Sequence, residues 1–362
     1  MTTTVAAATH KSRRLASVDA LRGITVAAML LVNDAGDWGH VFWPLDHAHW
    51  HGATPTDFIF PMFLFIMGVA IALAITPRLE QGKPRAPLVK AALWRALRIV
   101  VFGIIINALA MWLLDRHMRW PGVLQRIGVC FAIAGVLAIY TSPRVWWASL
   151  VGVLGIYTIA LHLGGTLAEW GNITDRVDTA VFGHHVYRWN EATGQGHDPE
   201  GLLSTLGALG TSLLGLCAGT WLRARRIKAL LIGGVVLALA GWLWSWSLPF
   251  NKNLWTPTFV LWTAGWSTLL LVAFHWMMDV RQWPPLGRRF GVNAIAAYGG
   301  SQVMAIVMVA TGGKDAVYGP LSGVITPWAG PYVASLVYAL LFVLLWWIVV
   351  WIMDRRRWYL KI

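Results

Sequence analysis

The sequence contains few charged residues. Only 12% of its 362 residues are Asp, Glu, Lys or Arg, whereas 57% are hydrophobic, and the mean hydropathy is +0.59. A soluble domain carries roughly twice that share of charge, so the composition argues against an ordinary soluble protein. The apolar residues form blocks of about twenty, which is long enough to cross a bilayer as helices. Many of the 24 Trp residues lie at block ends, where membrane-interface anchors gather.

Cysteine is also scarce. The two cysteines, Cys130 and Cys217, both lie inside apolar blocks, so we infer neither a disulfide framework nor a Cys-based zinc site. The chain has no convincing internal repeat and no low-complexity segment, which indicates one domain. Its net charge of +13 does not point to nucleic acid, because the basic residues sort by membrane side.

Ten apolar blocks are separated by Pro-containing polar segments. They cover residues 17–33, 57–76, 93–114, 121–140, 145–163, 201–222, 229–248, 257–276, 292–310 and 331–353. Because lipid offers no hydrogen-bond partners to the backbone, each block is predicted to be a helix. We therefore predict an all-α polytopic membrane protein with about ten transmembrane helices in a single transmembrane domain, residues 17–353.

The charges predict an orientation. With the N-terminus inside, 21 of the 29 basic residues fall in inner segments and six in outer loops, whereas 12 of the 16 acidic residues lie outside. This sorting predicts both termini in the cytoplasm. The tails 1–16 and 354–362 are expected to be cytoplasmic, and the first of them lacks the cleavage site of a signal peptide.

A polar segment containing His47 runs directly into the second apolar block, which begins at Asp57. Histidine exchanges protons near neutral pH, and a carboxylate nearby could orient it for acid–base chemistry. A plainer interpretation makes His47 a solvated loop residue and Asp57 a helix N-cap. His49 and His51 also permit a metal site, but no Cys or acidic partner has matching spacing, and we expect no metal.

Further polar residues gather on the predicted outer face. They are Asn33, Gln125, Arg126, Asp198, Glu200, Asn251, Lys252 and Asn253. Arg126 lies inside a predicted helix and needs either an ion-pair partner or a polar cavity that binds an anion or a carbonyl.

At the predicted inner end, Arg288 and Arg289 precede Asn293, and such a basic pair is either a topological signal or a phosphate contact. These residues leave two function classes, a membrane enzyme and a transporter. The missing internal repeat disfavours the transporter.

Several short motifs occur in a specific order. They are Ser17-Val-Asp-Ala-Leu-Arg-Gly23, Leu31-Val-Asn33, His47-Ala-x-Trp-x-Gly52, Thr56-Asp-Phe-Ile-Phe-Pro61, Pro121-Gly-Val-Leu-Gln-Arg-Ile-Gly128, Asp198-Pro-Glu-Gly201, Asn251-Lys-Asn-Leu-Trp255 and Gly291-x-Asn293. In this order, the motifs resemble the heparan-α-glucosaminide N-acetyltransferase family, including the bacterial NagX-like membrane proteins. The resemblance covers about residues 15 to 300.

The resemblance implies transfer of an acetyl group from cytoplasmic acetyl-CoA, as co-substrate, to the amine of a glucosamine across the membrane. His47 falls on the family's active-site His, as base or transient acetyl carrier, and Asp57 falls on its nearby acid. Asn33, Gln125, Arg126 and Asn293 fall on family polar positions in the transmembrane cavity. Asn33 joins the expected catalytic group. The residues expected to contact the cofactor are Gln125, Arg126, Arg288, Arg289 and Asn293, and those expected to contact the sugar are Asp198, Glu200, Asn251, Lys252 and Asn253.

The chain departs from the animal members at three points. Its 33–47 linker looks longer, His51 replaces an Asn, and their extra-cytoplasmic N-terminal domain is missing. We therefore expect a free or short-chain glucosamine as acceptor, and a bacterial inner membrane with His47 on the periplasmic side. A related acyltransferase with another acceptor and an amino-sugar transporter are the alternatives. A homodimer is compatible with the sequence.

Overall fold

Long helices dominate the chain, which the computed structural model describes over residues 15–360. The long helices are α1 Ala16–Asn33, α2 Ile59–Glu80, α3 Arg85–Leu114, α4 Val123–Tyr140, α5 Pro143–Leu163, α7 Thr205–Arg223, α8 Ile227–Trp244, α9 Pro257–Phe274, α11 Ala294–Ala310, α12 Gly313–Ala329 and α13 Pro331–Arg355. Within residues 15–360, nine spans are long and apolar enough to cross a membrane, or ten if the bent pair α11–α12 counts as one. The predicted all-α polytopic membrane protein is confirmed.

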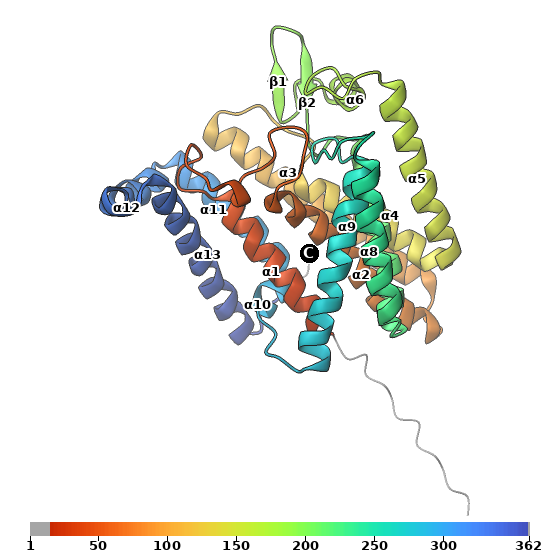
Figure 1. Cartoon of the computed structure of the whole chain (residues 1–362). Helices are drawn as coiled ribbons and strands as arrows, with labels where there is room; N and C mark the ends of the chain where they lie inside the picture. The colour runs from red at the N-terminus through yellow and green to blue at the C-terminus, as the bar shows by residue number, and fades with distance from the viewer. Residues whose placement is uncertain (1–14, 361–362) are drawn as a thin grey trace, which may run out of the picture.

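Short elements occur between the long helices. They are η1 Trp43–Leu45, η2 Pro55–Phe58, α6 Ile173–Phe182, β1 Arg188–Asn190, β2 Gln195–His197, η3 His275–Val280 and α10 Arg288–Val292. The strands form an antiparallel hairpin in which Arg188 pairs with His197. Figure 1 shows α6 and this hairpin together at one end of the bundle. We call residues 164–200, which contain them, the cap segment.

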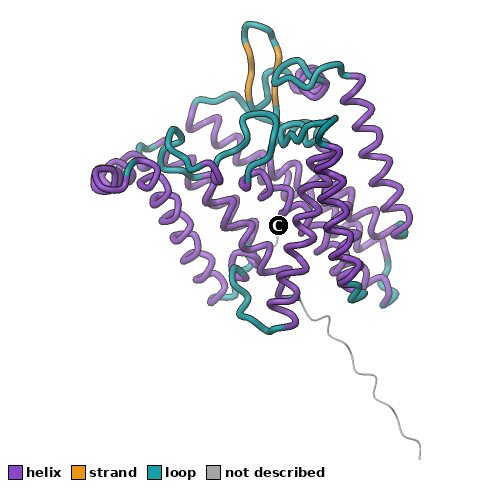
Figure 2. The backbone as a smooth tube through the Cα atoms, in the orientation of Figure 1, coloured by secondary structure: helices purple, strands orange, loops and turns teal. Residues whose placement is uncertain are grey.

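The connections lie at the two ends of the bundle, as Figure 2 shows in teal. At one end, Ser17 of α1 hydrogen-bonds to Asp279 after α9, and Arg288 of α10 lies 3.6 Å from Asp354 of α13. The described ends of the chain therefore share this face, which we call the terminal face. The opposite end carries the segment with His47 and the cap segment, and we call it the His47 face. The predicted tail 1–16 lies almost wholly outside the described residues.

Three boundaries differ from the prediction because proline acts less as a stop than expected. Helix α2 continues through Pro77 to Glu80, and α3 begins at Arg85 rather than at 93. Helix α12 occupies a stretch predicted to be a loop, although Pro320 and Pro327 lie inside it. It follows α11 at an angle of 83°. A helical proline removes one backbone hydrogen bond and usually kinks the helix, yet α2 continues through Pro77 and α12 through Pro320 and Pro327.

Helices α2 and α7 form a close contact at the centre of the bundle. Two glycines make this approach possible. A Cβ atom on Gly68 would lie 2.1 Å from the Ser212 carbonyl oxygen, and one on Gly215 would lie 2.0 Å from the Phe65 carbonyl oxygen. Helix α2 begins two residues after Asp57, so this packing also fixes the base of the site described below.

We expect Gly215→Ala to destabilise the bundle, because the new methyl group meets rigid backbone. Overpacking of this kind costs about 1–3 kcal/mol, and the thermal unfolding midpoint in detergent should fall clearly. Gly155→Ala is the matched control, since nothing lies within 4 Å of a Cβ atom there. Equal midpoints for the two variants would contradict the close α2–α7 contact.

Candidate active site

The carboxylate of Asp57 organises the loop that precedes α2. Asp57 is 1% exposed. It accepts hydrogen bonds from the backbone N–H groups of Thr54 and Ala48, at 2.9 and 3.1 Å, and from the Thr54 hydroxyl at 3.1 Å. Thr54 is the N-cap residue and Asp57 the third residue of this turn, so they form a capping box. The prediction that Asp57 is the N-cap itself was wrong by three residues.

His47 and Lys252 complete a three-residue cluster on this carboxylate. His47 Nδ1 lies 2.7 Å from Asp57 Oδ1, and its side chain is 43% exposed. Lys252 Nζ lies 3.0 Å from both ring nitrogens of His47 and 3.8 Å from Asp57 Oδ1. Burial lowers the pKa of Lys252, against the opposing pull of Asp57 and Glu200. The predicted His47–Asp57 pair is therefore formed, and its third member comes from a segment 205 residues away.

The turn that carries Lys252 is built by its neighbours. The Asn251 side-chain oxygen accepts from the Leu254 N–H at 2.8 Å, and its amide nitrogen lies 3.3 Å from His51 Nδ1. Trp255 has φ of 50°, a left-handed conformation that a bulky residue rarely adopts. The turn holds it there because its buried indole N–H donates to Thr211 at 3.0 Å. Such local strain often accompanies functional sites.

Arg126 is buried beside this turn and is incompletely paired. Its guanidinium lies over the Trp255 ring, 5.0 Å from the centroid, and Nη2 donates to Ser204 at 2.5 Å and to the Gly201 carbonyl at 3.2 Å. Its Nε and Nη1 atoms are buried and have no hydrogen-bond partner among the described residues. Buried polar groups in native structures are nearly always paired, so these two donors favour a ligand site over a structural ion pair.

Arg119 joins the two predicted acids of the cap segment. It donates to Asp198 at 2.6 and 2.9 Å and also to Glu200. Burial acts to lower the pKa of Arg119, but the two carboxylates hold it above its ordinary value. Burial acts to raise the pKa of Glu200, and the cations Arg119, Arg126 and Lys252 hold it below its ordinary value. The structure thus gives Asp198 an internal partner, whereas Glu200 lies in the field of all three cations.

The remaining predicted residues lie in three places. Asn33 ends α1 at the His47 face, half-buried, and Asn253 is half-buried in the Lys252 turn. Gln125 is buried and donates to the Trp120 carbonyl at 3.2 Å. Arg288 and Arg289, by contrast, lie at the terminal face beside Asp354. Asn293 is 2% exposed between α10 and α11, and both polar atoms of its amide lack a partner.

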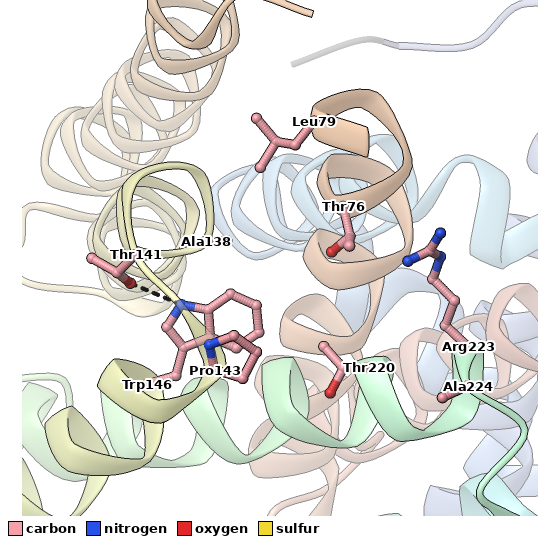
Figure 3. Close-up of a pocket in the computed structure, with 9 residues that line it drawn as sticks. All are labelled: Thr76, Leu79, Ala138, Thr141, Pro143, Trp146, Thr220, Arg223 and Ala224. Atoms are coloured by element: carbon pink, nitrogen blue, oxygen red, sulfur yellow. Dashed lines mark hydrogen bonds between the residues drawn. The ribbon is translucent and has the colours of Figure 1, made fainter. Parts of the chain in front are cut away.

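A cleft of about 510 Å³ lies elsewhere, at the ends of α2, α4 and α7 and the start of α5. Figure 3 shows Thr76, Trp146 and Arg223 around it. Thr76 is near the far end of α2 from Asp57, so this cleft does not belong to the His47 cluster.

Comparison with known proteins identifies the family. A family model described as "Heparan-alpha-glucosaminide N-acetyltransferase, catalytic" matches residues 14–250. The chain belongs to this family. It is 29% identical over 355 residues to the heparan-alpha-glucosaminide N-acetyltransferase of Homo sapiens, and 27% identical over 362 residues to that of Mus musculus. These alignments cover 80% and 81% of this chain and 53% and 54% of the relatives, so the chain spans about half the length of the curated relatives it matches.

The N-acetyltransferase family match contains His47, Asp57 and Arg126 but ends at residue 250, one residue before the Lys252 turn begins. The sequence motifs had placed Lys252 among sugar contacts, and only the fold brings it onto His47. Thr54 was missed although Thr-x-x-Asp is a recognisable capping signal. Arg119 was counted only as an outer basic residue, because its partners are about 80 residues away.

Asp178 of α6 is a further buried acid that the sequence did not single out. Leu202 N–H donates to one carboxylate oxygen at 2.8 Å, and the other oxygen has no partner. Burial raises the pKa of Asp178 to about 7, with Asp198 and Asp175 adding to the rise. The folded protein therefore keeps a proton between about pH 4 and 7 that the unfolded chain releases.

Because only the folded protein holds this proton, a lower pH favours the folded state. We expect the thermal midpoint of the wild type to fall as the pH rises from 5 to 8, because the contribution of Asp178 is full below its unfolded pKa and is lost as the pH passes about 7. Asp178→Asn should reduce that dependence, which differential scanning fluorimetry across pH can measure. A variant with the same pH slope as the wild type would show that Asp178 does not carry it.

Proposed function

We propose that the protein transfers an acetyl group from acetyl-CoA to the amine of glucosamine or of a short glucosamine-containing sugar. The observation that carries this proposal is the cluster of His47, Asp57 and Lys252 in a member of the N-acetyltransferase family. The cluster offers a nitrogen base, a carboxylate that orients it and a cation. An acyl transfer to an amine requires such a base together with donors for the developing oxyanion.

His47 is the proposed base or transient acetyl carrier. Because Asp57 accepts from Nδ1, the lone pair of the neutral ring lies on Nε2. In direct transfer, the acceptor nitrogen attacks the thioester carbonyl carbon, the C–S bond breaks, and Nε2 takes the proton of the amine. In a two-step transfer, Nε2 attacks the thioester carbonyl carbon, the C–S bond breaks and CoA leaves as the thiolate. The amine then attacks the acetyl carbonyl carbon, the bond to Nε2 breaks, and the freed imidazole takes the proton of the amine. Asp57 stabilises the positive ring in both cases.

Lys252 lies against the reactive nitrogen of this ring. Its ammonium is 3.0 Å from Nε2. The same ammonium lies where an acceptor amine would have to approach Nε2, so the acceptor displaces it.

Separate sets of residues are suited to hold the oxyanion and the sugar. The unpaired Nε and Nη1 donors of Arg126 supply hydrogen bonds for the oxyanion, and Asn33 is the second candidate, from the end of α1. Glu200 supplies a negative charge for an amino-sugar, and Asp198, Asn251 and Asn253 support the segments around it.

The donor is proposed to run through the bundle from the terminal face. Arg288 and Arg289 are half-exposed there and suit the phosphates of CoA. The unpaired amide of Asn293 and the buried Gln125 lie further along. The hydrocarbon core is about 30 Å thick, which an extended CoA can cross with its acetyl group directed to His47.

Transfer is tested with purified protein in detergent, labelled acetyl-CoA and glucosamine. We expect labelled N-acetylglucosamine to form. His47→Ala should lower kcat by about 10²–10⁴-fold, the usual contribution of a positioned base, and Asp57→Asn should also lower it. His49→Ala is the control, since His49 is exposed in the same loop. No product with any amino-sugar, but uptake into vesicles, would favour the transporter instead.

We further propose that the integral membrane protein lies in a bacterial inner membrane with the His47 face in the periplasm and both termini in the cytoplasm. A membrane-impermeant maleimide on intact cells should then label Glu191→Cys in the hairpin and leave Gln81→Cys, after α2, unlabelled. Both native cysteines are buried, so the background should be low. Labelling of Gln81→Cys alone would reverse the orientation.

A further inference from the structure

A second His–carboxylate pair lies in the cap segment. His197 Nδ1, at the end of β2, is 2.6 Å from Asp175 Oδ1 in the first turn of α6. The amide nitrogen of Asn172 donates to the other oxygen of Asp175, also at 2.6 Å. The His197 and Asp175 side chains are only 3% and 1% exposed, so this pair cannot reach a substrate itself.

The His197 ring packs against the loop that carries His47. Its centroid lies 5.3 Å from that of Trp50 and 6.2 Å from that of Trp170, in edge-on geometry. The Trp50 indole N–H also donates to the Leu167 carbonyl of the cap segment at 2.8 Å. Trp50 is three residues after His47, and the cap segment therefore holds the middle of the catalytic loop.

The two ends of that loop are held by other parts of the protein. Asp57 accepts a hydrogen bond from the backbone N–H of Ala48 next to His47, and the N–H of Gly52 donates to the Phe250 carbonyl at 2.8 Å, just before the Lys252 turn. His47 must lie between Asp57 and Lys252, which belong to different segments. The position of its backbone thus depends on how Trp50 is seated between these two anchors.

We propose that His197, oriented by Asp175, is a positioning residue that seats Trp50 and through it holds the His47 ring in its reactive place. The Nδ1–H of His197 is fixed on the carboxylate, which sets the plane of the ring and the edge that it presents to Trp50. The expected effect on acetyl transfer rests on the proposed function, whereas the placement of Trp50 and of the His47 ring does not.

The first test uses His197→Asn, whose amide keeps a donor for Asp175 and removes the ring from Trp50. We expect kcat for acetyl transfer to fall about 10-fold or more, because misplacing a catalytic group by about 1 Å can cost 10²-fold. KM for acetyl-CoA should stay unchanged, and the thermal midpoint should remain close to that of the wild type. His184→Asn, an exposed His near the hairpin, is the matched control and should leave kcat unchanged.

A double-mutant cycle on kcat separates positioning from general support. If His197 acts through Trp50, His197→Asn should cause no further loss beyond about two-fold in a Trp50→Ala background, since residues that act through one contact are not additive. Losses that multiply would overturn the proposal, as would a lower thermal midpoint with unchanged kcat.

A second measurement does not depend on turnover. Diethyl pyrocarbonate modifies accessible neutral histidines, and peptide mass spectrometry compares the rate at His47 with that at exposed His49. We expect His47 to react severalfold faster in His197→Asn and in Trp50→Ala, because the loop releases its ring from Asp57 and Lys252. An unchanged ratio in both variants would refute the positioning role. Absence of acetyl transfer in the wild type with this change present would instead refute only the proposed function.

Discussion

The arrangement of the His47 face depends on one buried carboxylate. Asp57 carries a charge at the mouth of an apolar helix, where an unpaired ion would be very costly. Four donors satisfy it: the His47 ring, the N–H groups of Ala48 and Thr54, and the Thr54 hydroxyl. Because all four come from the preceding loop and its turn, the need to solvate the charge also folds the loop that presents His47. The geometry proposed for catalysis and the local stability thus share one set of hydrogen bonds.

The same constraint explains why the other charges differ in role. Arg119 donates hydrogen bonds to both Asp198 and Glu200, and so ties the segment before α4 to the cap segment. Arg126, in the first turn of α4, has two donors without partners among the described residues. Among residues 15–360, Arg119 has partners for its donors and therefore supports the structure, whereas Arg126 has donors left over for a ligand. The number of partners distinguishes the two arginines, and their sequence positions alone do not.

The sequence predicts what is local. The apolar blocks predict the spans because, in lipid, each block must satisfy its own backbone hydrogen bonds. The sorting of Lys and Arg predicts the orientation of those spans. Pro77 and the stretch containing Pro320 and Pro327 were misread, since proline weakens a helix by an amount that packing can offset. The capping box at Thr54 could have been found from its spacing. The fold therefore follows from short-range physics, apart from the helix ends near proline.

The site is only partly local, and this limits its prediction. His47 and Asp57 are ten residues apart, and the family motifs mark both. Lys252 and His197 reach the loop that carries His47 from segments that lie 205 and about 150 residues away, and no sequence periodicity predicts these contacts. Three contacts hold that loop: Ala48 donates to Asp57, Gly52 donates to the Phe250 carbonyl, and Trp50 donates to the Leu167 carbonyl. Because contacts from distant segments hold this loop, the reactivity proposed for His47 depends on the assembled His47 face rather than on its own motif alone.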